Sequence, residues 1–267
     1  MSENSKVTAK HTDKKKFPTE FIDLPSNGWF YTENHPLASG QVELKYMTAR
    51  EEDILTSANL IRQGKVIDTL INALLVTDVS YDDILVGDKN AIMIAARILG
   101  YGKDYDIDLN CPKCGEKNKL QIDLTGLNNK ELPFDKYTKY SNEFEFQLPL
   151  AKQNITFKLM TGGDEKALES EMKGLAKFAN KQGPGKNLTT RLKHQIIAID
   201  GNRDTKLIRE YIDNDLFAQD SLALRNYMRE ASPDVITKFN FECESCGHTE
   251  TVDMPIDTGF FWPSSEA

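Results

Sequence analysis

Cys111-Pro112-Lys113-Cys114-Gly115 and Cys243-Glu244-Ser245-Cys246-Gly247 repeat one pattern, Cys-x-x-Cys-Gly, and together they contain all four cysteines of the chain. Each copy brings two thiols to one side of a tight turn, and the glycine relieves crowding where the chain reverses. Between Cys114 and Cys243 lie 128 residues. The pattern therefore connects the middle of the chain to its end.

Segments in which apolar and polar residues alternate flank each cysteine pair. Residues 105–109 and 120–124 flank the first pair, and residues 237–241 and 250–254 flank the second. Alternation with a period of two is typical of β-strands. The sequence therefore predicts two β-hairpins, each with a cysteine pair at its tip.

Four thiolates in two close pairs are a complete ligand set for zinc, which prefers four tetrahedral ligands. We therefore predict one structural Zn2+ site formed by Cys111, Cys114, Cys243 and Cys246, with no position left open for a catalytic water. In a reducing cytosol this pattern favours metal over disulfides, and a redox-active pair would stand at a helix start. His248 is an alternative ligand, but we expect it to be a surface residue.

The remaining patterns predict an α+β fold, in which a helical subdomain is followed by β-hairpins joined by a four-cysteine zinc ribbon. Residues 1–16 are expected to form a disordered basic tail, because they carry lysines without apolar periodicity. Residues 17–103 are expected to contain an extended, strand-rich entry and the helical subdomain. Residues 104–267 then form the zinc-ribbon region with an inserted hairpin and helices.

Several local signals place helices within residues 17–103. Thr48 and Glu51 have the spacing of a capping box and predict a helix that continues until just before Gly64. Two further helices are expected after this glycine, and the second of them should have Asp88 as its N-cap.

The region after the first cysteine pair shows both strand and helix patterns. We expect one hairpin over residues 142–160 and helices over residues 165–178, 189–199 and 221–229. Residues 181–186 contain two glycines and a proline and predict a loop. Residues 161–164, Thr-Gly-Gly-Asp, lack the lysine of a phosphate-binding loop and predict a helix cap instead.

The charge of the chain argues against a nucleic-acid partner. The formal net charge is -8, and both cysteine pairs are flanked by acidic residues, which would repel phosphates. A nucleic-acid-binding zinc-ribbon protein therefore remains only the alternative prediction. The sequence contains no apolar run near the roughly 20 residues that span a bilayer, and no signal for secretion, so membrane insertion is not expected.

No pattern of residues indicates catalysis. The four histidines, His11, His35, His194 and His248, form no H-E-x-x-H motif, and neither a G-x-S-x-G motif nor a P-loop is present. We predict that the protein is not an enzyme and has no small-molecule substrate.

Two aromatic clusters contain both tryptophans of the chain. The first consists of Trp29, Phe30 and Tyr31, and the second of Phe260, Phe261 and Trp262. Such residues either close the hydrophobic core or anchor a partner, since aromatic side chains dominate the energetics of both. Both alternatives stay open, and all six are candidate partner-binding residues.

The order of these features, and several local sequences, resemble a known family. They are Leu24-Pro25-Ser26-Asn27-Gly28-Trp29-Phe30-Tyr31, Met47-Thr48-Ala49-Arg50-Glu51-Glu52-Asp53-Ile54-Leu55, Gly87-Asp88-Lys89-Asn90-Ala91-Ile92, Arg97 with Tyr101-Gly102, and the two cysteine pairs. Together they resemble the baseplate hub proteins of T-even-type contractile-tailed bacteriophages. The resemblance implies a hub subunit or hub assembly factor, with other baseplate hub proteins as partners. It implies location in the host cytoplasm during assembly, and in the virion tail baseplate if the protein stays there.

Overall fold

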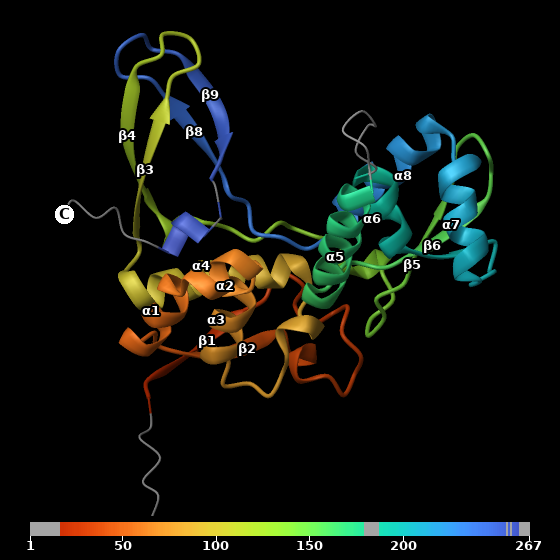
Figure 1. Cartoon of the computed structure of the whole chain (residues 1–267), viewed down its shortest axis with the longest axis horizontal. Helices are drawn as coiled ribbons and strands as arrows, with labels where there is room; N and C mark the ends of the chain where they lie inside the picture. The colour runs from red at the N-terminus through yellow and green to blue at the C-terminus, as the bar shows by residue number, and fades with distance from the viewer. Residues whose placement is uncertain (1–16, 179–186, 255, 257, 262–267) are drawn as a thin grey trace, which may run out of the picture.

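The computed structural model describes residues 17–178, 187–254, 256 and 258–261. The predicted basic tail, residues 1–16, and the predicted loop, residues 181–186, lie outside the described residues. Helices and small antiparallel sheets are mixed along the chain, which confirms the predicted α+β class. Figure 1 shows a helical body, a pair of hairpins that rise from it, and a second lobe beside it.

The body begins with two antiparallel strands, β1 (Thr19–Asp23) and β2 (Gln41–Lys45). The chain between them turns sharply at Gly28, whose φ of 72° lies in the left-handed region. A side chain there would also collide with the carbonyl oxygen of Ala38, at 2.4 Å from an added Cβ. The turn therefore requires glycine for two independent reasons.

Short helices follow, namely α1 (Ala49–Thr56), α2 (Ala58–Gln63) and α3 (Val66–Leu74). The predicted capping box of Thr48 and Glu51 is confirmed. The prediction of one unbroken helix before Gly64 was wrong, because Ser57 adopts an extended conformation with ψ of 103° and divides it. Leu55 is buried beside this break, so packing rather than helix propensity accounts for the division.

Helix α4 (Val86–Tyr101) is the central element of the body. Its N-cap is Leu85, so the prediction of Asp88 as N-cap was wrong. The Asp88 carboxylate is fully buried and accepts hydrogen bonds from the Ser26 amide (2.9 Å), the Ser26 hydroxyl (2.6 Å) and the Tyr31 hydroxyl (2.7 Å). The carboxylate therefore joins α4 to the turn after β1 instead of capping its own helix.

The second lobe contains a small antiparallel sheet of order β5-β6-β7, formed by β5 (Phe144–Gln147), β6 (Asn154–Phe157) and β7 (Ile196–Ile199). The predicted hairpin of residues 142–160 is confirmed by the pairing of β5 with β6. The predicted helix over residues 189–199 was wrong at its end. It stops at Gln195, and the next four residues, Ile-Ile-Ala-Ile, form the strand that completes this sheet.

The helices of this lobe are α5 (Gly162–Phe178), α6 (Asn187–Gln195), α7 (Thr205–Asn214) and α8 (Ala218–Ala231). The predicted cap before α5 is confirmed, since Thr161 and Asp164 bind each other's backbone amides at 3.1 and 3.3 Å. Helix α7 was not predicted. Asp204, whose carboxylate accepts from the amide of Lys206 at 2.8 Å, is the local signal that marks its start.

The hairpins that carry the cysteines are β3 (Asp104–Asn110) with β4 (Lys117–Asp123), and β8 (Lys238–Glu242) with β9 (Thr249–Asp253). Both hairpins were predicted, and both are antiparallel. They belong to separate sheets, because no strand of one pairs with a strand of the other among the described residues. Figure 1 shows them facing each other, with their tips farthest from the body.

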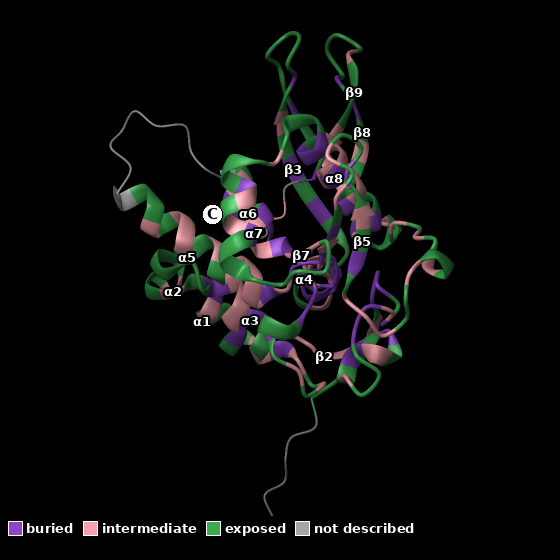
Figure 2. Cartoon of the chain, turned by 90° about the vertical axis from the view of Figure 1, so that its right-hand side faces the viewer, coloured by how far each residue is buried: buried purple, intermediate pink, exposed green. Residues whose placement is uncertain are grey.

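Short 3-10 turns connect these elements, at Pro36–Ser39 (η1), Tyr81–Asp83 (η2), Leu124–Gly126 (η3), Phe134–Lys136 (η4) and Thr258–Phe261 (η5). One hydrophobic core extends through the body, the second lobe and the base of the hairpins, while the hairpin tips are mostly exposed (Figure 2). Within the described residues, no helix is both long and apolar enough to cross a bilayer.

Candidate metal centre

The two cysteine turns have the same backbone structure. In the first turn, the amide of Cys111 donates to the carbonyl of Glu116 and the amide of Gly115 donates to the carbonyl of Cys111, both at 2.8 Å. The second turn repeats both hydrogen bonds at 2.9 Å, with Cys243, His248 and Gly247. The two glycines have φ values of 78° and 66°, in the left-handed region that the Cys-x-x-Cys-Gly pattern anticipates.

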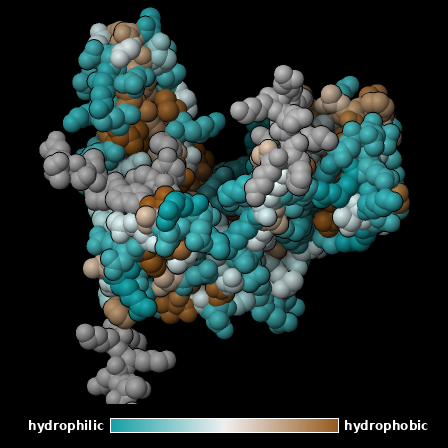
Figure 3. All heavy atoms as spheres, in the orientation of Figure 1, coloured by the Kyte–Doolittle hydropathy of each residue, from teal (hydrophilic) through white to brown (hydrophobic). Residues whose placement is uncertain are grey.

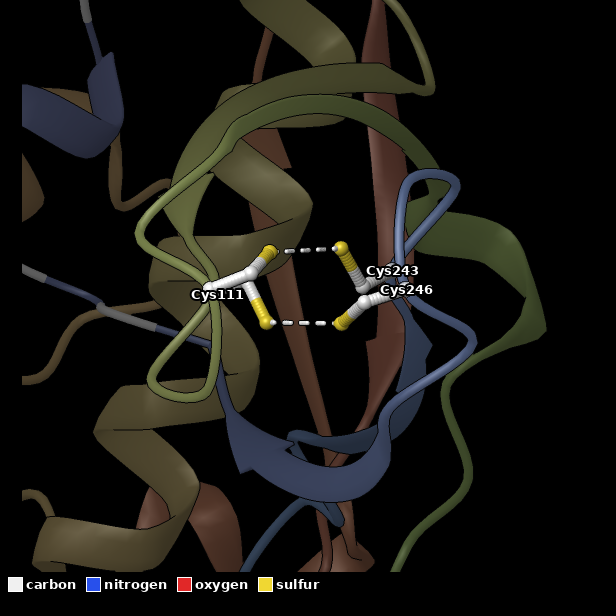
Figure 4. A group of neighbouring side chains, drawn as sticks. Cys111, Cys243 and Cys246 are labelled. Atoms are coloured by element: carbon white, nitrogen blue, oxygen red, sulfur yellow. Dashed lines mark hydrogen bonds between the residues drawn. The ribbon is translucent and has the colours of Figure 1, made fainter.

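The structure brings all four sulfur atoms together between the hairpin tips. The Sγ atoms of Cys111 and Cys246 lie 3.7 Å apart, as do those of Cys114 and Cys243, and all four lie within 4.8 Å of one another. In Figure 4, the labelled Cys111 faces Cys243 and Cys246 across the gap between the hairpins. Four sulfurs at about 2.3 Å from one tetrahedral zinc ion would be about 3.8 Å apart, so the separations fit this ion.

The cysteine cluster has a buried half and an exposed half. The first cysteine of each turn, Cys111 or Cys243, is buried, whereas Cys114 and Cys246 are exposed. The buried pair packs with Phe241 in a small apolar cluster apart from the main core, covered by Leu109, Leu120, Phe239 and Val252. The apolar side chains hold the two buried thiols in place and exclude water from them.

Asn118 connects the two cysteine turns through its side-chain amide. Its Nδ2 donates to the carbonyl of Glu116 at 3.0 Å and lies 3.7 Å from the Sγ of Cys243. Its Oδ1 accepts from the backbone amide of Glu244 at 3.1 Å. Sequence reasoning missed this residue. The sequence did contain a signal, because Asn118 is two residues before Leu120 and so lies on the same, inward face of its strand, where a polar residue is unexpected.

The thiols differ in how easily they ionise. Burial raises the pKa of Cys243, but hydrogen bonds from the backbone amides of Cys246 and Ser245 and from the thiols of Cys111 and Cys114 together outweigh it, and the pKa falls to about 6. The amide of Glu116 lowers the pKa of Cys114, whereas desolvation and the neighbouring thiols raise it, and the result is a pKa of about 12. The pKa values of these two thiols are therefore shifted in opposite directions, and a bound Zn2+ would favour the thiolate form of both.

His248 lies outside the cluster that could hold a metal ion, which Cys111, Cys114, Cys243 and Cys246 form by themselves. Its Nε2 lies 3.8 Å from the carboxylate of Glu250. Only its backbone carbonyl contributes to the second cysteine turn. The structure therefore gives no support to a histidine ligand.

The first aromatic cluster lies largely in the core of the chain. Phe30 and Tyr31 are buried, and the partly buried Trp29 packs against Phe134 with ring centroids 5.4 Å apart. The Trp29 indole donates to the carbonyl of Tyr137 at 3.2 Å. These contacts place Trp29, Phe30 and Tyr31 against the hydrophobic core.

The second aromatic cluster joins the base of the hairpins to α4. Phe260 and Phe261 are both 0% exposed, and the Phe260 ring lies 4.9 Å from that of Tyr105 in β3. The guanidinium of the buried Arg97 donates to the Phe260 carbonyl at 3.2 Å. Trp262 lies outside the described residues. A partner-binding role for either cluster stays a prediction.

Comparison with known proteins identifies the family. A family model described as "T4 bacteriophage base plate protein" matches residues 24–262. The searches of curated proteins and of solved structures gave no match. The matched segment includes the body from Leu24 onward, the second lobe and both cysteine hairpins, and this protein accordingly belongs to the T4 bacteriophage base plate protein family.

Proposed function

We propose that this protein is a non-enzymatic structural or assembly component of the hub of a contractile phage tail baseplate. The observation that carries the proposal is the family match, which covers residues 24–262. Other baseplate hub proteins are the proposed partners, in the host cytoplasm during assembly and, if the protein stays in the particle, in the virion tail baseplate. Helices and hairpins packed on one core, with an acidic surface, are compatible with a scaffold.

The second part of the proposal is one structural Zn2+ held by Cys111, Cys114, Cys243 and Cys246. The sulfur separations of 3.7 Å and the matched turns support it. A bound zinc ion would neutralise the thiolates and link the two hairpins. With four thiolates as ligands there is no open position for water, which is why we assign the site to structure and not to catalysis.

The chain needs such a link where the hairpins meet. Cys114 and Cys243 are 129 positions apart in sequence, and no strand pairing joins β3–β4 to β8–β9 among the described residues. The small cluster around Phe241 buries few side chains. A metal ion bound by the four sulfur atoms would therefore hold the two hairpins together where strand pairing is absent and few apolar side chains are buried.

The alternative is a nucleic-acid-binding zinc ribbon, and the surface charges of the hairpins disfavour it. The acidic residues Asp104, Asp106 and Asp108 are exposed along β3. Two of the lysines beside them are paired, Lys117 with Asp108 at 2.7 Å and Lys103 with Asp123 at 2.5 Å. Figure 3 shows hydrophilic residues over most of the outside of the hairpin pair. Filter binding at low salt separates the two functions, because a phosphate-binding protein would show affinity that falls steeply with salt.

The zinc site is tested by metal content and thiol titration on the purified protein. We expect one equivalent of zinc per chain and four thiols that react only after a chelator or denaturant is added. Freely reactive thiols together with an absence of zinc would reject the metal site. They would leave the family assignment untouched.

The baseplate role is tested on phage particles. An antibody against this chain should detect it in hub assembly intermediates of infected cells. Detection in mature particles as well identifies a permanent subunit, and detection in intermediates alone identifies an assembly factor. Absence from both would reject the proposed role.

A further inference from the structure

The thiols of the cysteine site make two close contacts, and each contact crosses from one hairpin to the other. The Sγ atoms of Cys111 and Cys246 are 3.7 Å apart, and so are those of Cys114 and Cys243. Dashed lines in Figure 4 mark these contacts across the gap between the hairpins. The sulfur atoms of a disulfide are about 2.05 Å apart, so each pair would have to close by only about 1.7 Å to form one.

Each of these pairs combines one exposed thiol with one buried thiol. Cys246 and Cys114 are exposed, whereas their partners Cys111 and Cys243 are buried. An oxidant dissolved in water therefore reaches one sulfur of each pair, and the other sulfur lies where it can attack the oxidised one. A pairing of Cys111 with Cys243, or of Cys114 with Cys246, would lack this division.

The two hairpins can approach each other more easily than the two cysteines of one turn can. Among the described residues, no strand of β3–β4 pairs with a strand of β8–β9, so no backbone ladder fixes the distance between the hairpins. Each cysteine turn, in contrast, is closed by two backbone hydrogen bonds around its own pair. Short, stiff loops close with strain, whereas separate hairpins can shift as units. The geometry therefore favours disulfides between the turns over disulfides within them.

We propose that the cysteine site has a second, covalent state, in which a peroxide converts the four thiols to two disulfides, Cys111–Cys246 and Cys114–Cys243. This inference deepens the proposed zinc site, and it rests on the proposed function for the change of environment. Zn2+ links the hairpins while the protein is in a reducing cytoplasm, and the disulfides link the same two turns in an oxidising medium. The middle of the chain then stays joined to its end in both environments.

The exposed thiol of each pair is oxidised first. Its sulfur attacks one oxygen of hydrogen peroxide, the O–O bond breaks, and a sulfenic acid and one water form. The buried thiol then attacks the sulfenic sulfur, and a second water leaves as the disulfide forms. Two electrons thus pass from two sulfurs to one peroxide. When the site starts with Zn2+ bound, two peroxides oxidise the four thiolates, four protons are taken from solvent to form four waters, and Zn2+ is released.

Peptide mapping of the full chain tests the pairing, because trypsin cleaves after Lys113 and so separates Cys111 from Cys114. Three tryptic peptides contain the cysteines, namely residues 104–113, 114–117 and 239–267. After treatment with hydrogen peroxide and alkylation without reduction, mass spectrometry should find all three peptides joined in one species. Disulfides within the turns would instead join the first peptide to the second and leave the third by itself.

Double variants identify the partner of each thiol. Cys114→Ser with Cys243→Ser keeps the close pair of Cys111 and Cys246, and Cys111→Ser with Cys243→Ser is the matched control that keeps the two exposed thiols. Peroxide should form the disulfide at least about tenfold faster in the first variant than in the control. A bond between residues 135 positions apart makes the denatured chain compact, so it runs faster on a non-reducing gel. Circular dichroism checks that both variants are folded.

The melting temperature tests whether the disulfides replace the metal. A chelator should leave the melting temperature of the oxidised wild type unchanged, and the chelator together with dithiothreitol should lower it. Zinc content before oxidation separates the two proposals, because a zinc-free protein that forms both disulfides between the turns rejects the zinc site alone. Disulfides within the turns, disulfides between chains, or sulfinic acids in place of disulfides overturn this inference, whatever the zinc content.

Discussion

The guanidinium of Arg97 in α4 donates a hydrogen bond to the backbone carbonyl of Phe260, which lies 163 positions later in the chain. The same side chain donates to the carbonyls of Gly102 (3.1 Å) and Asp104 (3.2 Å), where α4 ends and β3 begins. Arg97 is 3% exposed. One buried cation therefore fixes the end of the chain and the base of the first cysteine hairpin to the central helix.

Replacing Arg97 by methionine should lower the free energy of unfolding by about 3 kcal/mol, because the buried carbonyl of Phe260 and the partly buried carbonyls of Gly102 and Asp104 lose their donor. Arg97→Lys should recover only part of this loss, since an ammonium group lacks the planar fork of donors. Urea denaturation measures both. Arg62→Met is the control, because the exposed Arg62 bonds only within its own helix, and its effect should stay within about 0.5 kcal/mol. Equal losses of stability in Arg97→Met and Arg62→Met would show that the hydrogen bonds of the Arg97 guanidinium do not stabilise the fold.

Truncation of the Phe260 ring distinguishes a core role from a partner-binding role. Because this ring is fully buried against Tyr105, Phe260→Ala should cost about 3–5 kcal/mol of stability in the isolated chain. Leu222→Ala, at a residue that is 52% exposed, is the control. Unchanged stability combined with failed tail assembly would instead favour partner binding by the second aromatic cluster.

Metal removal should destabilise the cysteine hairpins. We expect a chelator to lower the melting temperature of the wild type by at least about 5 °C, because the ligand set stabilises only the folded chain. Cys111→Ser should melt at the lower temperature with or without the chelator. Ser245→Ala, in the same turn as two of the ligands but without a ligand of its own, should behave like the wild type. A wild type insensitive to the chelator contradicts the zinc assignment.

Asn118 should tune the affinity of the cysteine site without being a ligand. Asn118→Leu keeps the size of the side chain but removes the donor near the Cys243 sulfur and the acceptor of the Glu244 amide. Zinc affinity, measured by competition with a chromophoric chelator, should fall about tenfold or more. Gln121→Leu, at an exposed position of the same strand, should leave the affinity unchanged. A similar loss in both variants would mean that the effect belongs to the hairpin as a whole.

The buried Asp88 carboxylate should make stability depend on pH. Burial raises its pKa to about 6, against the donors Ser26 and Tyr31, which lower it, while Asp234 nearby raises it further. A raised pKa means that the folded chain binds the proton more tightly than the unfolded chain, whose carboxyl titrates near 3.8. The contribution of this group to stability is therefore fully present below about pH 3.8 and is lost as the pH rises through 6.

Across that window the free energy of unfolding of the wild type should fall by about 3 kcal/mol relative to Asp88→Asn, which does not titrate. Chemical denaturation at several pH values measures the difference, and Asp53→Asn, at an exposed carboxylate of α1, controls for the substitution itself. Parallel curves for the wild type and Asp88→Asn would show that folding does not raise the pKa of this carboxyl group.

Local patterns in the sequence were sufficient to predict the cysteine turns, their hairpins, the capping box of Thr48 and Glu51, and the helix cap at Thr161. Each of these depends on residues a few positions apart. The predictions failed where a distant contact competes with a local preference. Asp88 would suit a helix N-cap but binds Ser26 and Tyr31, and the four residues after Gln195 continue an apolar helical pattern but pair with β6.

The amino-acid pattern alone was enough to predict that the four cysteines lie together, as a group that could bind a metal ion, and to predict the class of the fold. Periodicity and the spacing within each cysteine pair are properties of short segments. The pattern could not show that Asn118 bridges the two cysteine turns or that Arg97 holds Phe260. Asn118 and its partner Glu244 are 126 positions apart, and Arg97 and Phe260 are 163 positions apart. These contacts arise only when the whole chain is packed, since periodicity records which face of an element is buried but not what it is buried against.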